Sequence, residues 1–390
     1  MKLKALPVFM AFLAMGIVDA VGPFVSLAKK EFSLSTAVAS LIPFVGLSMF
    51  GLLSIPAGIL QERRGKRFVL LLGLTVTLVG MLNASFGLTS FPRFLVTVVL
   101  IGVGAAVLQV AGNPLMRDIS AKGKFPRNLS LGQFVKAIGS LSGPLIPALA
   151  ARWFGASWDV IFPVYGGLLV LTILAAAALR VNTDAPNPNA ATLGSCLRLL
   201  KNGYVLAMAG AIFVYVGAEI CVSAGIPLFL KERYAVDMTR VGLLGTGLFF
   251  MALTIGRLGG GVILNWIAPG RFLKLTCAAA LCGLLALFVP SRTVAVAAFV
   301  VIGLGFANIF PLVFSAALER MPERSNELSA LMVTAIVGGA ILPPLMGILA
   351  DHTTVRTGLL IPIVSIGYVI AVALATGHEE ESVPAGKVLA

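Results

Sequence analysis

Long runs of apolar residues, separated by short polar connections, recur along the whole of this chain. A transmembrane α-helix needs about 20 consecutive apolar residues to cross roughly 30 Å of hydrocarbon. Twelve runs of this kind predict twelve transmembrane helices and therefore an all-α integral membrane protein. The predicted helices lie at 6–27, 37–60, 68–89, 93–116, 129–151, 158–179, 204–230, 241–265, 271–290, 294–317, 326–350 and 356–377.

The composition agrees with a membrane protein and excludes several other classes. Of 390 residues, 58% are hydrophobic and only 12% are charged, and the mean hydropathy is +1.01. A soluble fold has too little interior to bury this much apolar surface, and a disordered chain is far more polar. The net charge of +13 would suit a nucleic-acid-binding protein, but the hydropathy argues against a soluble one. The bilayer is therefore the expected environment, and no nucleic-acid partner is expected.

The basic residues predict how the helices are oriented, because Lys and Arg concentrate in cytoplasmic loops. With the N-terminus inside, connections on the inner side carry 18 Lys and Arg residues, and those on the outer side carry nine. Both termini are therefore predicted to be cytoplasmic. The initial MKLK precedes a long apolar run that no small-residue cleavage site closes, so we interpret this run as the first helix and not as a signal peptide.

A Pro- and Asn-rich stretch divides the twelve predicted helices into six and six. Residues 181–203, which include NTDAPNPNAATLGS, are predicted to form a cytoplasmic linker. The linker separates an N-terminal six-helix bundle at 1–180 from a C-terminal bundle at 204–380, and a cytoplasmic tail follows at 381–390. The two halves resemble each other weakly at an offset near 200. Transporters built from such repeats bind their substrate near the membrane midplane between the halves.

The connection after the second predicted helix reads GILQERRGKR at residues 58–67. It resembles the signature of the major facilitator superfamily, a Gly-x-Leu-x-Asp-Arg-x-Gly-Arg-Lys pattern, with Glu62 where Asp is usual. The resemblance implies a fold of two pseudo-symmetric six-helix bundles and an inner-side gate that stabilises the outward-open state. A solvated basic loop would explain the arginines but not the glycine spacing. The implied gate residues are Gly58, Glu62, Arg63, Gly65 and Arg67.

Five further segments are LQVAGNP at 108–114, GQFVKAIGSLSGP at 132–144, YVGAE at 215–219, FANIFPLVFS at 306–315 and AIVGGAILPPLMGILAD at 335–351. Together they resemble the bacterial fucose and glucose/galactose proton-symporter family, with LQVA and YVGAE closer to the glucose/galactose branch. Val21 and Gly22 stand where the family has an Asn-Asp pair, and the nearest acid is Asp19. Gln109 replaces a glutamate of the fucose branch, as in the glucose/galactose branch, and Lys136 replaces an asparagine.

Polar side chains within the predicted helices are few and are concentrated on helices 4, 5, 7 and 10. Residues three or four apart share a helix face, so the pairs on helices 4, 5 and 7 should each point to one side. Those faces should point inward, and the resemblance implies a cavity lined by helices 1, 4, 7 and 10. Neutral amides suit a substrate with several hydroxyls, although each alone would also serve as a bond between helices. The predicted substrate-binding residues are Gln109, Asn113, Gln133, Lys136, Tyr215, Glu219 and Asn308.

A charge at the centre of a bilayer costs roughly 2.5–3.5 kcal/mol, so ionisable residues inside the membrane are functional candidates. Counted from the inner side, Asp19 lies about 20 Å along helix 1 and Lys136 about 10 Å along helix 5. We hypothesise that they form an ion pair that opens when Asp19 binds a proton; a permanent structural pair is the alternative. Glu219 is a candidate second proton site, an acceptor for substrate hydroxyls or a packing residue. Arg257, near the inner end of helix 8, is interpreted as snorkelling to the interface.

Together these features predict a secondary active transporter of a bacterial cytoplasmic membrane that imports a monosaccharide by proton symport with alternating access. The proton is the expected coupling ion. No cofactor, metal or enzyme activity is expected, because the sequence contains no metal-type cluster and no nucleotide-binding loop. Lys136 would also suit a small organic anion or a sugar acid, and an uncoupled sugar uniporter and an amphiphile exporter are further alternatives. The resemblance implies a monomer.

Overall fold

In the computed structural model, all regular elements of the described residues are helices, and these residues contain no β-strand. The structure describes residues 2–19, 28–29, 31–39, 41–87, 90–178, 192–235 and 246–380. Each of the twelve predicted transmembrane segments corresponds to one helix or to a short series of consecutive helices. The all-helical fold class predicted from the apolar runs is therefore confirmed.

The first half of the chain forms helices at the positions of the first six apolar runs. Their bounds are α1 (Lys2–Asp19), α3 (Thr36–Ala39), α4 (Leu41–Arg64), α5 (Lys66–Ser85), α6 (Phe91–Ile119), α7 (Phe125–Phe154), η1 (Trp158–Val160) and α8 (Ile161–Ala177). Within this half, α6 packs against both α4 and α5, α8 packs against α5, and α1 packs along α7. The six long helices therefore form one bundle around α1 and α6.

A short helix forms within the predicted linker, and helices at the positions of the six remaining apolar runs follow. Their bounds are α9 (Leu193–Leu199), α10 (Gly203–Tyr234), α12 (Leu248–Ile263), α13 (Pro269–Ala286), α14 (Arg292–Phe306), α15 (Ile309–Arg320), η3 (Pro322–Arg324), α16 (Ser325–Thr334), η4 (Ala335–Val337), α17 (Gly338–His352), α18 (Val355–Gly358) and α19 (Leu360–Glu380). α10 contacts both α17 and α19, and α14 contacts both α12 and α13.

The lengths of the helices agree with a multi-pass membrane protein. By length and composition, nine spans within the described residues can cross a membrane, or ten if the bent helix α7 counts as one span. α1 and α12 hold shorter apolar helices; α1 ends directly before residues outside the described ranges, and α12 begins three residues after such a stretch. Residues 20–27 and 241–245 of two predicted spans lie outside those ranges. So do the linker residues up to 191 and the predicted tail at 381–390.

Two spans of the second half are interrupted within the membrane. The tenth is broken at Ala307 and Asn308, between α14 and α15, and the eleventh contains the turn η4 between α16 and α17. A break removes helical partners from nearby backbone N–H and carbonyl groups. Inside a membrane, such groups are tolerated where other protein groups or a cavity satisfy them. The two breaks are therefore positions where side chains of other helices are expected to supply hydrogen bonds.

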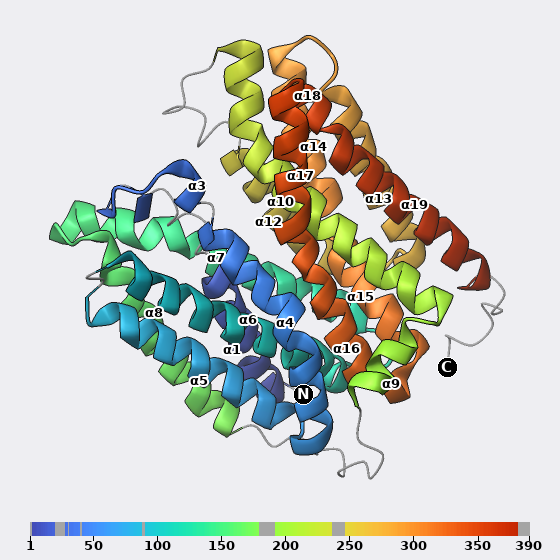
Figure 1. Ribbon diagram of the computed structural model, residues 1–390. Coiled ribbons are helices and arrows are strands. Elements are labelled where there is room, and N and C mark those ends of the chain that lie inside the picture. The colour runs from blue at the N-terminus through green and yellow to red at the C-terminus, as the bar shows by residue number, and fades with distance from the viewer. Residues whose placement is uncertain are drawn as a thin grey trace.

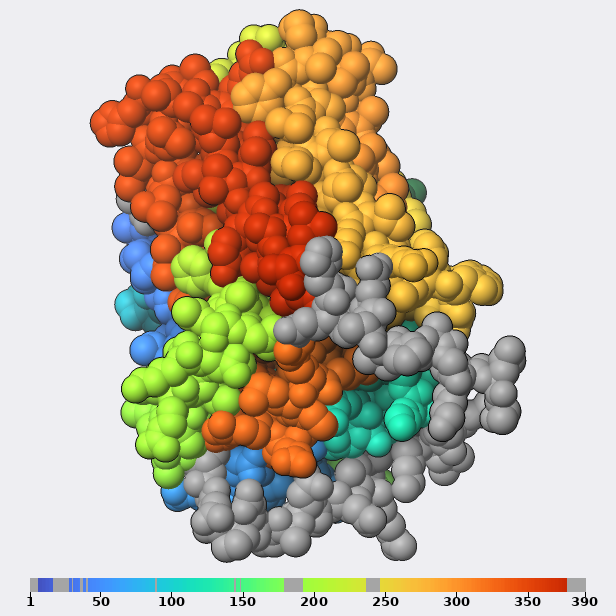
Figure 2. Space-filling model, turned by 90° about the vertical axis from the view of Figure 1, so that its right-hand side faces the viewer, coloured from blue at the N-terminus to red at the C-terminus, as the bar shows by residue number. Residues whose placement is uncertain are grey.

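The two halves lie side by side and meet at one end. Figure 1 shows the blue-to-green helices of the first half opposite the yellow-to-red helices of the second, with α9 at the lower end near α4 and α16. The halves touch through α4 against α16 and through α7 against α12 and α15. Figure 2 shows α19 between α10 and α13, on the face of the second half that points away from the first half. Leu206, Leu285 and Val364 of these helices are exposed, as expected of a surface that faces lipid hydrocarbon.

Candidate functional site

A cluster of hydrogen-bonding groups lies inside the second half. The hydroxyl of Tyr215 on α10 donates a hydrogen bond to Glu219 Oε2, which lies 2.7 Å away and one helical turn further along. The same hydroxyl lies 2.9 Å from the carbonyl oxygen of Phe306, the last residue of α14. Tyr215 is fully buried. The shared helix face predicted from the spacing of Tyr215 and Glu219 therefore produces a direct contact, and this contact reaches the break in the tenth span.

Arg257 on α12 belongs to this cluster. Its Nη2 lies 3.7 Å from Glu219 Oε1, and only 12% of the arginine side chain and 17% of the glutamate side chain are exposed. The interpretation of Arg257 as a snorkelling residue is therefore wrong. The physical reason is the close approach of α12 to its neighbours, because a Cβ added to Gly256 would lie only 2.6 Å from the Cβ of Ala307. This packing holds the arginine inside the protein, next to a carboxylate.

Asn308 lies in the break between α14 and α15. Its Nδ2 donates a hydrogen bond to the carbonyl oxygen of Gly256 over 2.7 Å. Its Oδ1 is buried and has no hydrogen-bond partner among the described residues. Because Gly256 directly precedes Arg257, this bond connects the helix break to the ion pair. The structure thus brings three of the predicted site residues together in one half: Tyr215, Glu219 and Asn308.

The predicted site residues of the first half are also buried. Gln109 and Asn113 on α6 and Gln133 on α7 are each no more than 2% exposed. Within the described part of the chain, both amide atoms of Asn113 and the Nε2 of Gln133 are buried without a hydrogen-bond partner. Most buried polar atoms in proteins are paired, and unpaired ones often mark the position of water or a ligand. The role of these amides in substrate binding stays a prediction.

α1 crosses α7 closely beside Lys136. A Cβ added to Gly16 would lie 1.8 Å from the backbone oxygen of Lys136, and the Ser140 hydroxyl donates a hydrogen bond to the carbonyl oxygen of Gly16 over 3.1 Å. Lys136 is 8% exposed. Asp19 is the last residue of α1, and its side chain lies outside the described part of the structure. The ion pair between Asp19 and Lys136 therefore stays a prediction.

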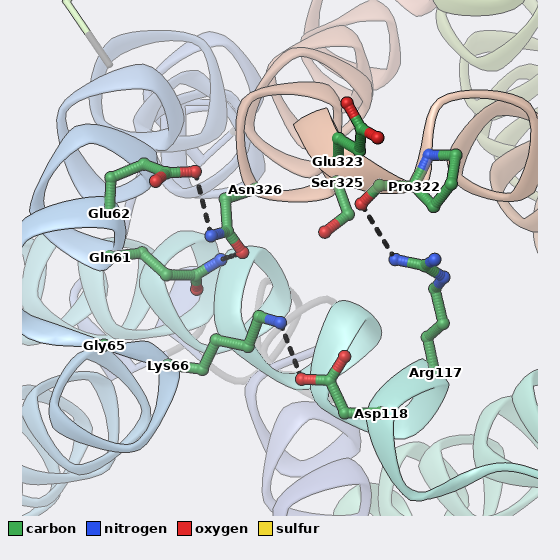
Figure 3. Close-up of a pocket in the computed structure, with 10 residues that line it drawn as sticks. All are labelled: Gln61, Glu62, Gly65, Lys66, Arg117, Asp118, Pro322, Glu323, Ser325 and Asn326. Carbon is green, nitrogen blue, oxygen red and sulfur yellow. Dashed lines mark hydrogen bonds and ion pairs between the residues drawn. The ribbon is translucent and has the colours of Figure 1, made fainter. Parts of the chain in front are cut away.

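The two halves are joined at the end of the molecule that carries the signature motif. Asn326 at the start of α16 accepts a hydrogen bond from Gln61 Nε2 over 2.7 Å and donates one to Glu62 Oε1 over 2.9 Å. Figure 3 shows both α4 side chains pointing toward Asn326 beside a polar cavity of about 340 Å³. Across the cavity, Arg117 donates a hydrogen bond to the carbonyl oxygen of Pro322 over 3.2 Å. Glu62, the acid of the motif, thus bonds directly to the other half.

The other residues of the signature motif have distinct structural positions. Gly58 faces α16, where an added Cβ would lie 2.4 Å from the Cβ of Ala330. Gly65 has a φ of 83° and forms the tight turn between α4 and α5. Arg63 is exposed, whereas Arg67 donates a hydrogen bond to a backbone carbonyl at the end of α8. The glycine spacing therefore has two reasons, a close helix contact and a positive φ.

Further hydrogen bonds join the halves at this end, and none of them is predicted by the sequence analysis. Arg127 at the start of α7 donates through Nη1 to Asn265 Oδ1 over 3.2 Å. The buried hydroxyl of Ser329 on α16 donates to the carbonyl oxygen of Val110 on α6 over 2.9 Å. The partners are 138 and 219 residues apart, so no local pattern could indicate them. We call this region, defined by Gln61, Glu62 and Asn326 and the bonds around them, the gate end.

The short helix α9 lies within the predicted linker at 181–203 and attaches this part of the chain to the gate end. Ser195 donates a hydrogen bond to Glu327 Oε1 over 2.7 Å, and Arg324 pairs with the same carboxylate. Burial raises the pKa of the neighbouring Cys196 thiol to about 11, so this side chain is an uncharged packing group at neutral pH. Because Glu327 directly follows Asn326, the contacts of α9 and those of the gate end share one turn of α16.

A comparison with protein families agrees with this architecture. Residues 8–336 match the model of the Major Facilitator Superfamily, and this match spans most of the chain. The chain belongs to the major facilitator superfamily. Membership makes it a multi-pass membrane transporter and not an enzyme, and it confirms the predicted architecture of twelve transmembrane helices in two bundles.

Individual members of the superfamily show closer similarity. The chain is 28% identical to a glucose/galactose transporter of Brucella abortus over 356 residues, which cover 87% of this chain and 86% of that protein. It is 26% identical to a putative glucose/galactose transporter of Helicobacter pylori over 379 residues, or 91% of each. A crystal structure of the Escherichia coli fucose:proton symporter matches with a TM-score of 0.82 at 18% identity, covering 95% of this chain and 97% of that one. The resemblance identified from the motifs is therefore confirmed.

Replacing Tyr215 with phenylalanine is expected to lower the stability of this superfamily member. The change leaves Glu219 Oε2 and the Phe306 carbonyl without their shared donor, and unpaired buried acceptors cost about 1–3 kcal/mol. The midpoint of thermal unfolding, measured on the detergent-solubilised protein, should therefore fall. Tyr368→Phe is the matched control, because the Tyr368 hydroxyl is exposed and makes a long bond of 3.4 Å to the Ala207 carbonyl. Equal midpoints for the two variants would contradict the prediction.

Proposed function

We propose that this transporter imports a monosaccharide of the glucose, galactose or fucose type together with a proton, across a bacterial cytoplasmic membrane. The two relatives are named as glucose/galactose transporters and the structural neighbour as a fucose:proton symporter. The proposal places both termini in the cytoplasm, in accord with the distribution of Lys and Arg, and treats the protein as a monomer. Transport occurs by alternating access between the two halves.

The observation that carries the substrate assignment is a set of buried neutral amides in both halves. Asn113, Gln133 and Asn308 each hold at least one buried amide atom without a partner among the described residues. An amide offers both a donor and an acceptor, which is the complement of a hydroxyl group. Asn308 also lies at a helix break, and broken helices near the midplane form the binding sites of many secondary transporters. Neutral groups of this kind favour a neutral polyol.

Proton coupling is proposed to depend on Asp19, Lys136 and Glu219. α1 and α7 cross at Gly16 and Lys136, so the backbone of Asp19 lies about one helical turn beyond the level of Lys136. The long lysine side chain can span such a gap. Protonation of Asp19 would remove the charge that the proposal pairs with Lys136, and losing an ion pair is unfavourable inside a membrane. Rearrangement of the halves would then relieve this cost. Glu219 supplies a second acid in the other half.

The described conformation is proposed to be the one closed toward the cytoplasm. In support, the halves are joined at the end where Lys and Arg concentrate, through the bonds of Gln61 and Glu62 to Asn326. A single hydrogen bond contributes about 0.5–1.5 kcal/mol, and one to a charged group about 1.5–3 kcal/mol. A gate made of a few such bonds is stable enough to close this end and weak enough to open during each transport cycle.

Uptake into proteoliposomes tests the proposal. Labelled glucose, galactose and fucose are offered separately, with and without an imposed acid-outside pH gradient, and at least one sugar should accumulate only with the gradient. Equal uptake with and without the pH gradient would instead show that the protein is a uniporter. A sugar acid is the second candidate, because Lys136 puts a basic side chain where the family has asparagine. Uptake of glucuronate without uptake of the three neutral sugars would favour that candidate and contradict the proposal.

A further inference from the structure

We infer that Arg257 and Glu219 together form a subsite that binds two adjacent hydroxyl groups of a neutral substrate. The inference rests on the proposed sugar transport and adds a specificity-determining residue, Arg257, to it. It follows from three properties of the pair: its accessibility compared with the rest of the cluster, its unused hydrogen-bonding capacity and its zero net charge.

The pair is the accessible part of the cluster in the second half. Tyr215 is fully buried and Asn308 is 1% exposed, whereas the side chains of Arg257 and Glu219 are 12% and 17% exposed. Tyr215 therefore holds the carboxylate in position from the buried side, through its bond to Glu219 Oε2. Asn308 supports α12 through its bond to the Gly256 carbonyl, one residue before the arginine. The buried side chains of Tyr215 and Asn308 thus fix the positions of the charged side chains of Glu219 and Arg257, which remain partly exposed.

The two charged groups do not saturate each other. The separation of 3.7 Å between Arg257 Nη2 and Glu219 Oε1 is longer than a hydrogen bond of about 2.7–3.2 Å. Arg257 Nε is buried out of reach of a ligand and has no hydrogen-bond partner among the described residues, so the donors open to a ligand are those of the two Nη groups. A guanidinium carries five N–H donors, and an ionised carboxylate carries about four acceptor positions. The pair therefore retains donors on one side and acceptors on the other.

Two adjacent hydroxyls match this arrangement. One hydroxyl can donate its proton to Glu219 Oε1 while the next accepts from Arg257, so both bonds are charge-assisted and stronger than neutral ones. An anionic ligand would be attracted to Arg257 but repelled by Glu219. A cationic ligand would be attracted to Glu219 but repelled by Arg257. The neutral pair therefore selects a neutral diol. The planar fork of arginine fixes the direction of its donors, so lysine would not replace it.

Exchange with deoxy sugars tests the subsite in the full-length protein. The sugar that the unaltered protein exchanges best is radiolabelled, and unlabelled 2-, 3-, 4- and 6-deoxyglucose compete with it in proteoliposomes. Two of the deoxy sugars should compete roughly 10- to 100-fold more weakly, because each lacks one charge-assisted hydrogen bond to the subsite. The hydroxyls missing from these two sugars should be at adjacent ring positions. The double variant Glu219→Gln/Arg257→Gln keeps the pair neutral. In this variant, the potency with which those two deoxy sugars compete should be within about twofold of that of glucose.

Two further variants complete the test. Arg257→Lys should lose the same discrimination although it keeps the charge, whereas Arg152→Lys, a change at an exposed arginine, should retain it. Gel filtration verifies that each variant is folded. If the double variant exchanges sugar and discriminates among the deoxy sugars as the unaltered protein does, the inference is overturned and the proposed function stands. If the unaltered protein exchanges no neutral sugar, both are overturned.

Discussion

Replacing Asp19 with asparagine is expected to abolish accumulation of sugar against its gradient while leaving exchange of labelled for unlabelled sugar intact. One proton moved through 100 mV supplies about 2.3 kcal/mol. At 1.36 kcal/mol per decade, this drives roughly fifty-fold accumulation. Asparagine keeps the size of the side chain but binds no proton near neutral pH, so the variant should equilibrate sugar at a ratio of about one. The measurement is the steady-state ratio of internal to external sugar in proteoliposomes under an acid-outside gradient.

The same variant distinguishes proton coupling from a permanent structural ion pair. A structural pair predicts that Asp19→Asn loses exchange together with accumulation, because removing one partner of a buried ion pair costs about 3–5 kcal/mol. Asp351→Asn is the matched control, since Asp351 is exposed at the end of α17, and it should accumulate sugar normally. Undiminished accumulation by Asp19→Asn would show that coupling does not use Asp19.

The positions of the helices could be predicted because the bilayer imposes a minimum length on every span. The run at 93–116, for example, corresponds to α6 at Phe91–Ile119. The break in the tenth span could not be predicted in this way, because FANIFPLVFS is apolar on both sides of Asn308. The structure shows that Asn308 bonds to a carbonyl of α12, 52 residues earlier in the chain. Pro311 is a local signal for the break, because it lacks the N–H that would bond the Ala307 carbonyl. The bond of Asn308 to α12 is a tertiary contact, and hydropathy alone carries no information on tertiary contacts.

The candidate site shows the same division between local and distant contacts. Tyr215 and Glu219 are four residues apart on one helix, so their contact follows from helical geometry. The partner of Glu219, Arg257, lies on another helix, and its position near the end of a predicted span led to its wrong interpretation as a residue of the membrane interface. One signal was present, because the segment GRLGGG places small residues around the arginine, and small residues let transmembrane helices approach closely. The glycines thus pointed to a packed position for Arg257.

The gate end combines a recognisable motif with a partner that no motif indicates. Glu62 follows from the superfamily signature, but Asn326, to which it bonds, lies 264 residues further along the chain. The sequence therefore identified one side of the contact only. The two halves approach each other here through α4 and α16, and Gly58 is the residue that permits this approach.

Replacing Gly58 with leucine is expected to hold the gate end open. Even a Cβ at this position would lie 2.4 Å from the Cβ of Ala330, well inside the usual carbon–carbon contact of about 3.5–4.0 Å, and leucine adds three further carbons. Overpacking typically costs about 1–3 kcal/mol. The cost falls only on the closed state, so the population of the open state should rise about tenfold for each 1.4 kcal/mol, and sugar uptake should fall.

Ser329 reports the state of the gate, because it is fully buried and its hydroxyl bonds to the Val110 carbonyl of the other half. Ser329→Cys is introduced together with Cys282→Ser, which removes the exposed native thiol, and maleimide labelling is timed on the detergent-solubilised protein. Labelling should be slow in this background and at least several-fold faster when Gly58→Leu is added. Gly167→Leu is the matched control, because an added Cβ at Gly167 meets nothing within 4 Å. Equal labelling rates for the two leucine variants, with both folded, would mean that contact between α4 and α16 does not control closure.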